Sequence, residues 1–256
     1  MNLTDTHSHL YAKEFKDDLD ESIQRCLDDG VERIFLPNID LESIEPMLAL
    51  EEAYPSNCFA MMGLHPCSVK ENFEKDLSLI KDWLTKRDFA AIGEIGIDLY
   101  WDSSLLKQQQ TAFIKQIEWA KELKKPIIIH TRNSFNEIFE ILDDLNDDHL
   151  SGIFHCFSGN IEQATRAIDY GNFWLGIGGV LTFKNAGLDH VVKDIDLSRL
   201  VLETDSPYLA PTPYRGKRNE SSYLKLIATK LAEVKNVSLE EIAQITTANS
   251  KKIFGR

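Results

Sequence analysis

Residues 107–132 read KQQQTAFIKQIEWAKELKKPIIIHTR and contain one complete step from a helix to a strand. The apolar side chains of the first part recur at helical spacing, and they are Phe113, Ile114, Ile117, Ala120 and Leu123. Because charged residues occupy the other positions, the pattern predicts a helix with one core-facing side. Two lysines end this helix before Pro126. The apolar run 126–131 then predicts a buried strand with His130 near its end.

The same alternation repeats along the whole chain. Short apolar runs predict eight strands, near residues 2–5, 32–37, 57–63, 89–95, 126–131, 151–156, 172–177 and 199–204. Helical patterns lie between and after them, at residues 17–30, 41–54, 73–87, 104–124, 134–145, 160–170, 187–194, 219–235 and 238–254. Strands that alternate with helices form parallel sheets, and eight such units close into a barrel. The sequence therefore predicts an α/β fold, a single-domain TIM (β/α)8 barrel over residues 1–256.

Composition and charge limit the function class. The chain has 256 residues and a net charge of −13, which argues against a broad nucleic-acid-binding face. A nuclease is not excluded, because bound cations can invert the field locally. No run is long enough to span a membrane and the N-terminus lacks a signal-peptide pattern, so we expect a cytoplasmic protein without a membrane partner. The four cysteines lack CxxC spacing and are expected to be small buried hydrophobes or unpaired thiols, and none is assigned to metal.

Imidazoles and carboxylates stand where the predicted strands end. The candidates that follow strands 1, 4, 5, 6 and 8 are His7, His9, Glu94, His130, His155 and Asp205. The active site of such a barrel lies at the carboxyl ends of its strands, so these side chains should converge there. His7 and His9 are two residues apart and point the same way, as two ligands of one metal require. Since divalent cations take nitrogen and oxygen ligands, the pattern predicts a metallohydrolase.

Six segments resemble, in order, the signature segments of one family. They are Asp5-Thr6-His7-Ser8-His9, Gly63-Leu64-His65-Pro66, Gly93-Glu94-Ile95-Gly96-Ile97-Asp98, His130-Thr131-Arg132, His155-Cys156-Phe157-Ser158-Gly159 and Glu203-Thr204-Asp205-Ser206-Pro207-Tyr208. From residue 4 to about residue 250 the chain resembles the TatD family of metal-dependent deoxyribonucleases, which belong to the amidohydrolase-like barrels. The resemblance implies metal ligands at His7, His9, Glu94, His130, His155 and Asp205.

This ligand set implies two divalent cations per chain, with Glu94 as the bridge between them. The first cation would take His7, His9 and Asp205, and the second His130 and His155. Two cations about 3.5–4 Å apart can clamp one phosphoryl group. Asp205 could also take a proton from the attacking water, so Asp205 and Glu94 are the expected catalytic residues. Mg²⁺ and Mn²⁺ suit phosphodiester chemistry whereas imidazoles favour Zn²⁺ or Mn²⁺, and the metal stays open.

Three residues near the candidate ligands have further possible roles, and two of them, His65 and Arg132, allow more than one interpretation. His65 could contact a phosphate oxygen or an extra cation, or it could be a structural histidine in a tight turn. Arg132 could pair with a phosphate in a bidentate way or neutralise Asp98. Glu203 shares the orientation of Asp205 by alternation and could orient a ligand histidine from outside the metal shell.

Other titratable residues near the motifs are expected to stay out of the metal shell. Cys156 alternates away from His155 and should pack behind the site. His149 and His190 lie in polar helix-end contexts and are expected at the surface.

The segment 206–219 is the basic stretch beside the predicted metal site, and three prolines stiffen it. Its candidates for substrate binding are Tyr208, Arg215, Lys217 and Arg218. A tyrosine offers a face for base stacking and the cations can meet phosphates, although the loop could instead be a rigid cover leading into the next helix. Trp101 and Phe157 could line a nucleobase slot or be ordinary rim packing.

Three function classes remain. The resemblance favours a divalent-metal deoxyribonuclease, which would release nucleotides from the 3′ end of single-stranded or frayed DNA without an obligate protein partner. A metal-dependent hydrolase of amides, esters or lactones, acting on a small molecule or an acylated tRNA, would use the same water-activating centre. A non-catalytic metal-binding protein is disfavoured, because a structural site normally closes its coordination.

Overall fold

The structure is a computed structural model, and it describes residues 1–255. The strands are β1 (Leu3–Asp5), β2 (Val31–Leu36), β3 (Cys58–Ala60), β4 (Ile92–Asp98), β5 (Ile127–Arg132), β6 (Gly152–Phe154), β7 (Phe173–Ile177) and β8 (Leu200–Leu202). The helices are α1 (Leu19–Asp28), α2 (Ile44–Ala53), α3 (Phe73–Lys86), α4 (Leu106–Leu123), α5 (Phe135–Leu145), α6 (Ile161–Asp169), α7 (Leu188–Asp194), α8 (Leu224–Lys235) and α9 (Leu239–Phe254). All the predicted strands and helices are present, with boundaries shifted by a few residues.

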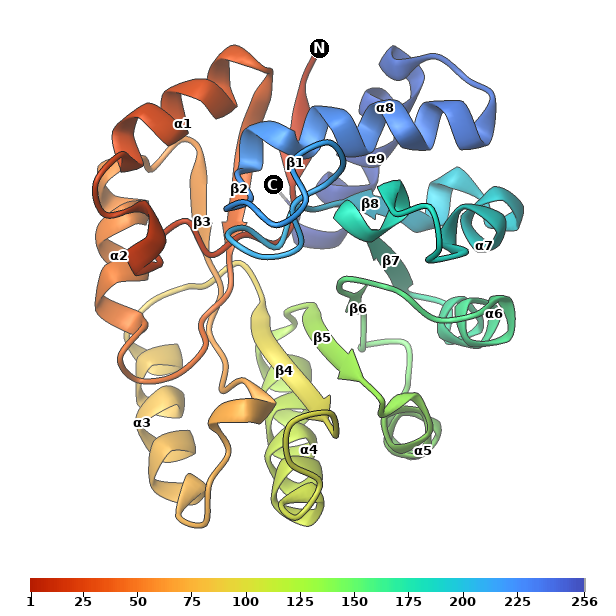
Figure 1. Cartoon of the computed structure of the whole chain (residues 1–256). Helices are drawn as coiled ribbons and strands as arrows, with labels where there is room; N and C mark the ends of the chain where they lie inside the picture. The colour runs from red at the N-terminus through yellow and green to blue at the C-terminus, as the bar shows by residue number, and fades with distance from the viewer. Residues whose placement is uncertain (256) are drawn as a thin grey trace.

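The strands form two parallel sheets, in the order β1-β2-β3 and β4-β5-β6-β7-β8. Backbone hydrogen bonds join the two sheets at both seams. Between β3 and β4, the amide of Gly93 donates to the carbonyl of Met62 over 3.0 Å. Between β8 and β1, Thr6 donates to Leu202 over 3.0 Å and Asp205 donates to His7 over 2.9 Å. The predicted (β/α)8 barrel is therefore confirmed, with its helices in a ring outside the strands (Figure 1).

The β4 strand departs from regular pairing just where it brings a carboxylate into the barrel. Its register against β5 shifts between Ile92 and Ile95, around Gly93 and Glu94. A Cβ atom at Gly93 would stand 2.6 Å from Cβ of Ile128, so only glycine fits here. Close backbone approach thus sets the position from which Glu94 projects.

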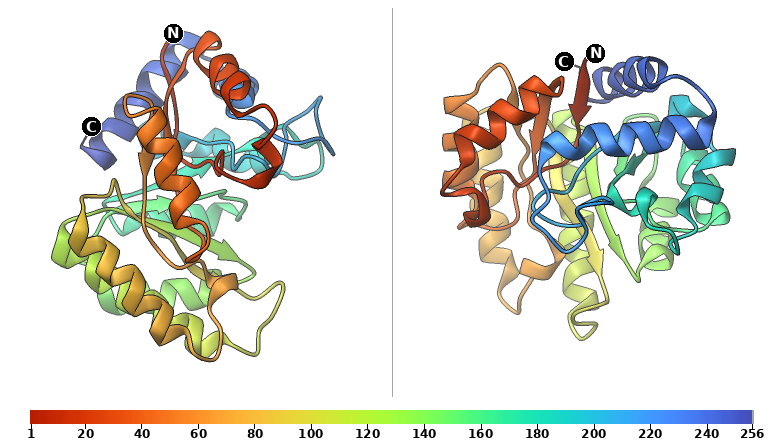
Figure 2. Two further views of the ribbon diagram at one scale, coloured as in Figure 1. Left: turned by 90° about the vertical axis from the view of Figure 1, so that its left-hand side faces the viewer. Right: turned by 45° about the horizontal axis from the view of Figure 1, so that its top comes forward.

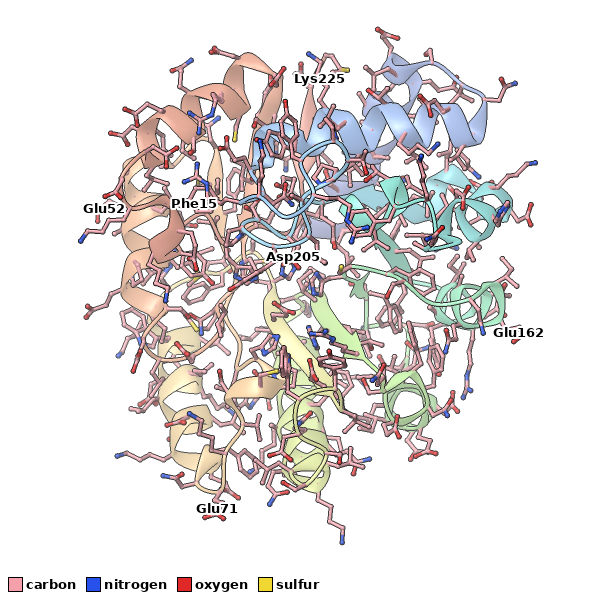
Figure 3. All side chains as sticks on the ribbon, viewed as in Figure 1. Phe15, Glu52, Glu71, Glu162, Asp205 and Lys225 are labelled. Carbon is pink, nitrogen blue, oxygen red and sulfur yellow. The ribbon has the colours of Figure 1, made fainter. Side chains whose placement is uncertain are left out.

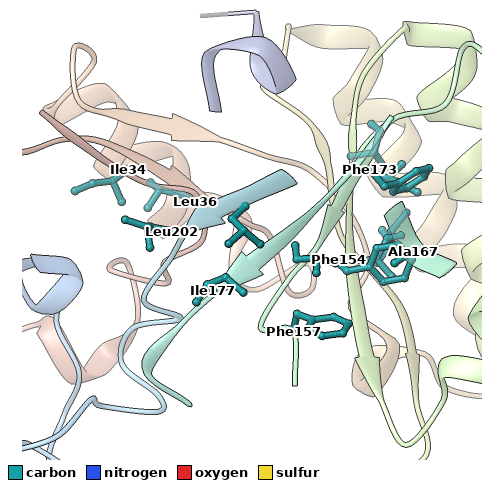
Figure 4. Packing of buried hydrophobic residues seen from close by; sticks show 14 of the residues in the cluster. Ile34, Leu36, Phe154, Phe157, Ala167, Phe173, Ile177 and Leu202 are labelled. Atoms are coloured by element: carbon teal, nitrogen blue, oxygen red, sulfur yellow. The ribbon is translucent and has the colours of Figure 1, made fainter. Parts of the chain in front are cut away.

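Two apolar layers pack on the two faces of the sheet. The outer layer lies between strands and helices, where Phe154 of β6 and Phe173 of β7 pack beside Ala167 of α6 (Figure 4). The inner layer fills the barrel interior, and we call it the floor. It consists of Phe35, Met61, Ala90, Ala91, Ile128, Ile153, Trp174, Val201, Ile253 and Phe254. The last two come from α9, which packs against β1 and β8. Phe254 stacks on Phe35 with ring centroids 3.7 Å apart, and α9 lies beside the N-terminal strand in Figure 2.

The helix predicted over 219–235 begins later than expected, at Leu224. Asn219 is fully buried, and its side-chain amide donates to the carbonyls of Thr204 over 2.7 Å and Tyr208 over 2.6 Å. These bonds tie the chain back to the end of β8, so Asn219 and Glu220 belong to the loop, and a 3-10 helix over Ser221–Tyr223 leads into α8. Within residues 1–255, no helix is both long and apolar enough to cross a membrane.

Candidate metal centre

The candidate site lies directly above the floor. Side chains two residues apart on a strand point to the same side. The residues two positions after the floor residues therefore also face the barrel interior. In β5 and after β6, His130 follows Ile128 and His155 follows Ile153. Asp205 lies near the middle of the ring of helices, far from labelled surface residues such as Glu71 (Figure 3). The structure therefore brings together the ligand candidates predicted after different strands.

One group of side chains surrounds the Oε2 atom of Glu94. The Nε2 atom of His7 lies 3.1 Å from this oxygen and that of His9 lies 3.6 Å away. Asp205 completes the group, since its Oδ1 is 3.7 Å from Nε2 of His7 and 3.6 Å from Nε2 of His9. Two imidazole nitrogens and two carboxylates thus face a common point.

A second group surrounds the other oxygen of Glu94, Oε1. The Nδ1 atom of His130 lies 2.8 Å from it and Nε2 of His155 lies 3.0 Å from it. His65 joins this group, because its Nε2 is 3.3 Å from Oε1 of Glu94 and 3.3 Å from Nδ1 of His130. The structure places His65 with the second group of nitrogens, within reach of the same oxygen.

The electrostatics of the two groups suit cations. Burial alone would raise the pKa of Glu94, but the nearby His155, His65 and His7 outweigh it and hold the pKa well below the usual value. His7 is fully buried, and burial lowers its pKa, so the neutral ring keeps a lone pair. A buried carboxylate shared by imidazoles is a donor set that borderline divalent cations prefer. The residues present therefore fit a metal centre.

The outer nitrogen of His9 is held in a defined role. Its Nδ1 lies 2.8 Å from the hydroxyl of Tyr11, and this hydroxyl donates to the carbonyl of Pro37 over 2.5 Å. Because the hydroxyl proton is used on Pro37, the hydroxyl accepts from Nδ1 of His9. The Nε2 atom of His9 is then free to bind a cation, as ligand histidines commonly require. Tyr11 was not predicted, because it reaches His9 through the turn that follows β1 and not through strand alternation.

Glu203, predicted to orient a ligand histidine, lies beside His155. It is fully buried, its Oε1 lies 3.3 Å from Nδ1 of His155, and the same oxygen accepts a hydrogen bond from the amide of Cys156. A Cβ atom at Gly176 would stand 2.1 Å from its other oxygen, so glycine on β7 makes room for it. Glu203 is therefore placed to orient His155.

Asp5 has a different role from its neighbours His7 and His9. Its carboxylate accepts from the amide of Thr204 over 2.9 Å and from the hydroxyl of Thr204 over 2.6 Å. Burial raises the pKa of Asp5 to about 7. Both oxygens are thus engaged in joining β1 to the segment after β8, which holds the two histidines opposite Asp205.

A pocket of about 750 Å³ opens above the two groups, a size typical of small-molecule and nucleotide sites. Its lining includes the exposed aromatic residues Trp101 and Tyr208. Cys156 also lines it, so the prediction that Cys156 packs behind the site is wrong. The reason is its left-handed backbone (φ 47°), which breaks the strand alternation. Phe157 is buried, with its ring 5.7 Å from that of Phe135, and lies outside the pocket lining.

Arg132 also lines the pocket and is engaged by aromatic residues. Its guanidinium carbon lies 3.7 Å from the ring centroid of Tyr100 and 5.4 Å from that of Trp101. Stacking of this kind leaves the edge of the guanidinium available to a phosphate. His149 and His190 are exposed at the surface, as expected.

The cations of the loop 206–219 lie away from the pocket. Arg218 donates to both oxygens of Asp18, over 2.5 and 2.7 Å, and to Glu220 over 2.8 Å. Its guanidinium is therefore occupied, and we do not assign it to substrate. Arg215 stacks on Phe183 at 3.8 Å and lines a separate hollow. Lys217 is exposed, 6.0 Å from the ring of Tyr214, and of the four candidates only Tyr208 lines the pocket.

Comparisons with known proteins agree with this architecture. The chain is 42% identical to the metal-dependent hydrolase YabD of Bacillus subtilis, over 98% of both chains. It is 33% identical to the metal-dependent hydrolase MJ1582 of Methanocaldococcus jannaschii, over 100% of this chain and 98% of that one. The crystal structure of YjjV, a TatD homologue from Escherichia coli, superposes with a TM-score of 0.93 at 29% identity, covering 99% of this chain and 98% of that one.

A sequence profile described as TatD related DNase matches residues 4–255, which include every residue of both groups around Glu94. The relatives just described are named as metal-dependent hydrolases or as a TatD homologue. Together with a barrel that gathers imidazoles around a shared carboxylate, these matches identify the chain as a member of the TatD related DNase family and a metal-dependent hydrolase.

Proposed function

We propose that this protein is a deoxyribonuclease that uses two divalent cations, Mg²⁺, Mn²⁺ or Zn²⁺. The observation that carries the proposal is the division of the Glu94 carboxylate: Oε2 faces His7 and His9, whereas Oε1 faces His130 and His155. A carboxylate that serves two sets of nitrogens in this way is the expected bridge of a two-cation site.

When bound, such cations lower the pKa of water and neutralise charge on a phosphoryl group. The chain supplies the proton acceptor. The side chain of Asp205 is 14% exposed, whereas that of Glu94 is 3% exposed, so Asp205 is the carboxylate that an attacking water can reach. Burial alone would raise the pKa of Asp205, but His9, His155 and His7 lower it, which keeps Asp205 ionised and able to accept a proton.

The mouth of the pocket supports a nucleic-acid substrate. Tyr208 and Trp101 line it and are 50% and 72% exposed, so both can stack on bases, and Arg132 can pair with a phosphate. Because the ligand groups lie deep in the barrel, a terminal nucleotide of a single strand enters more easily than an internal phosphate of a duplex, which requires base extrusion. We propose exonucleolytic action on single-stranded or frayed ends, in the 3′ to 5′ direction that the family resemblance implies.

A hydrolase of amides, esters or aminoacyl-tRNA would use the same centre on a carbonyl carbon. The basic loop 206–219 supports a DNA substrate less strongly than the sequence suggested. Arg218 pairs with Asp18, and Arg215 lines a separate hollow. The exposed aromatic residues at the mouth of the pocket still favour the nuclease over the carbonyl hydrolase. The proposal includes a cytoplasmic location and no obligate protein partner.

The test uses chelator-stripped protein with Mg²⁺, Mn²⁺ or Zn²⁺ added back. Oligonucleotides labelled at the 5′ or 3′ end are compared as single strands and blunt duplexes, together with covalently closed circular DNA. We expect loss of mononucleotides from the 3′ end of the single strand. Cutting of the circle as fast as the linear strand would replace the exonuclease with an endonuclease. Hydrolysis of carboxylic esters without any cleavage of DNA would overturn the proposal in favour of the carbonyl hydrolase.

A further inference from the structure

Asp98 lies at the end of β4, between the candidate metal centre and the exposed loop that follows. It is buried, and its backbone is held on both sides by the side chain of Gln109, which accepts from the Asp98 amide over 2.8 Å and donates to its carbonyl over 3.1 Å. A carboxylate fixed in this way has two oxygens with constant orientations.

The two oxygens serve different parts of the molecule. Oδ2 lies 2.9 Å from Nε2 of His130. Oδ1 accepts from the amide of Tyr100 over 2.9 Å and from that of Trp101 over 3.3 Å. One side chain thus contacts a candidate metal ligand and also the loop whose aromatic rings pack around Arg132.

We propose that Asp98 is a positioning residue for both halves of the site: it sets the tautomer of His130 and it holds the loop that presents Tyr100, Trp101 and Arg132 to the substrate. The part about the substrate rests on the proposed deoxyribonuclease activity. The part about His130 holds for any reaction that the centre catalyses.

The effect on His130 follows from hydrogen-bond chemistry. A carboxylate only accepts, so Nε2 of His130 must carry the proton that points at Asp98. In the neutral ring, Nδ1 then keeps its lone pair, and Nδ1 is the atom 2.8 Å from the shared oxygen of Glu94. Without Asp98, the proton can move to Nδ1 and block the position where a cation would bind.

The backbone that leads into the loop is held by the amide of Leu99, which donates to the carbonyl of Arg132 over 2.9 Å, and the next two amides donate to Asp98. Tyr100 and Trp101 are 53% and 72% exposed, so packing against the core holds them weakly. Two amide hydrogen bonds to one buried carboxylate fix the backbone at this point. Tyr100 can then stack under Arg132, and the stack presents a guanidinium edge and the Trp101 indole at the mouth of the pocket.

Two substitutions separate the two roles. In Asp98→Asn, the amide oxygen can still accept from Tyr100 and Trp101, but the amide nitrogen donates to His130 and favours the wrong tautomer. In Asp98→Ala, both contacts are lost. The matched control is Asp102→Asn in the same loop, since Asp102 is exposed and accepts from Ser104 without contacting His130.

Calorimetric titration with Mn²⁺ and quenching of tryptophan fluorescence by a single-stranded oligonucleotide measure the two roles without turnover. We expect Asp98→Asn to weaken the binding of one Mn²⁺ ion by about 10–100-fold, because His130 is no longer held in the right tautomer. Quenching of tryptophan fluorescence by the oligonucleotide should stay normal, and excess Mn²⁺ should restore the turnover of this variant. Asp98→Ala should weaken the binding of both Mn²⁺ and the oligonucleotide. Its KM for the oligonucleotide should stay above the wild-type value even at high Mn²⁺. Asp102→Asn should match the wild type in every measurement.

The proposal is overturned if Asp98→Asn binds Mn²⁺ as the wild type does, or if Asp98→Ala keeps normal oligonucleotide quenching. Thermal unfolding of each variant checks that the fold is retained. If the wild type itself does not bind oligonucleotides, the deoxyribonuclease proposal fails, while the Mn²⁺ titrations still decide the role of Asp98 toward His130.

Discussion

The floor and the metal centre are built on the same strands, two residues apart. Ile128 and Ile153 belong to the floor, whereas His130 and His155 lie directly above them and face Glu94. Below, the side chains are apolar and α9 closes the interior with Phe254. Above, nearly every side chain is a hydrogen-bonding or charged group. The division shows that strands such as β5 and β6 contribute to stability at one end and to chemistry at the other, as is general for such barrels.

The largest effect is expected from Glu94→Gln in the upper region. An amide cannot supply two charged oxygens to two groups of imidazoles, so turnover should fall by at least about a thousandfold, which corresponds to about 4 kcal/mol of transition-state stabilisation. Thermal unfolding should shift by only a few degrees. Glu71→Gln at the exposed surface is the control and should leave turnover unchanged. If Glu94→Gln retained substantial activity, the shared carboxylate would not be the bridge.

Phe254→Ala tests the lower region and should show the reverse pattern. The substitution removes the ring that stacks on Phe35, and loss of a buried aromatic ring costs about 3–5 kcal/mol of unfolding free energy. Urea unfolding measures this loss, and Phe254→Leu should lose less. Turnover per folded molecule should stay near the wild-type value, measured where both proteins are folded. A specific loss of turnover would show that the floor shapes the metal centre directly.

Gly176→Ala tests whether Glu203, at the boundary between the floor and the metal centre, orients His155. Its new Cβ would stand 2.1 Å from Glu203 Oε2, so Glu203 must leave the amide of Cys156 and the Nδ1 atom of His155. We expect turnover to drop by about 10–100-fold, as for other residues that orient a metal ligand. Gly178→Ala is the control, because its nearest neighbour would be an ordinary 3.7 Å away. Equal kinetics in the two variants would remove Glu203 from the orienting role.

Arg132→Ala compares the pocket with the surface outside it. Arg132 lines the pocket, whereas Arg215 lines a separate hollow. Loss of one phosphate contact should weaken oligonucleotide binding and reduce the salt slope by about 1, with little change for Arg215→Ala. Binding measured between low and moderate salt gives both values. The opposite ranking would return the loop 206–219 to the substrate path.

The smallest effect concerns the support of that loop. Hydrogen bonds from Arg218 and Arg25 hold the pKa of Asp18 well below its usual value. A lowered folded-state pKa contributes stability above the unfolded pKa, about 3.9, and this contribution is lost as the pH falls further. Since Asp18 is one-third exposed, Asp18→Asn should cost at most about 1 kcal/mol at pH 7, and the difference should shrink below about pH 4. Asp17→Asn is the exposed control, and a loss that does not depend on pH would indicate packing instead.

Most of the fold could be predicted from the sequence, because strand and helix periodicities alternate clearly, as in residues 107–132. The candidate ligands could be grouped as well, since they follow strand ends that converge in a barrel. Asp98 was given no contact with His130, because this partner lies 32 residues away on the next strand and no local pattern marks the pair. Cys156 was misplaced because one left-handed residue reverses the alternation.

Contacts between residues far apart in the sequence were also not predictable. Arg218 looked available for phosphates in a basic loop, but its partner Asp18 lies 200 residues away in the sequence. No local pattern marks such a pair. His65 was similarly left open, because its place beside Oε1 of Glu94 depends on how the loop after β3 turns over the barrel.

The floor also has a consequence for the order of events during synthesis. Ile253 and Phe254 are made after all eight strands, yet they occupy the interior beneath the strands. While the ribosome still holds these residues in its exit tunnel, the emerged strands lack part of their apolar filling, and exposed strand interiors are prone to aggregation. The nascent chain can therefore seal its barrel only after translation has passed α9. Slowed translation between β8 and α9 should make the unfinished chain a client for chaperones.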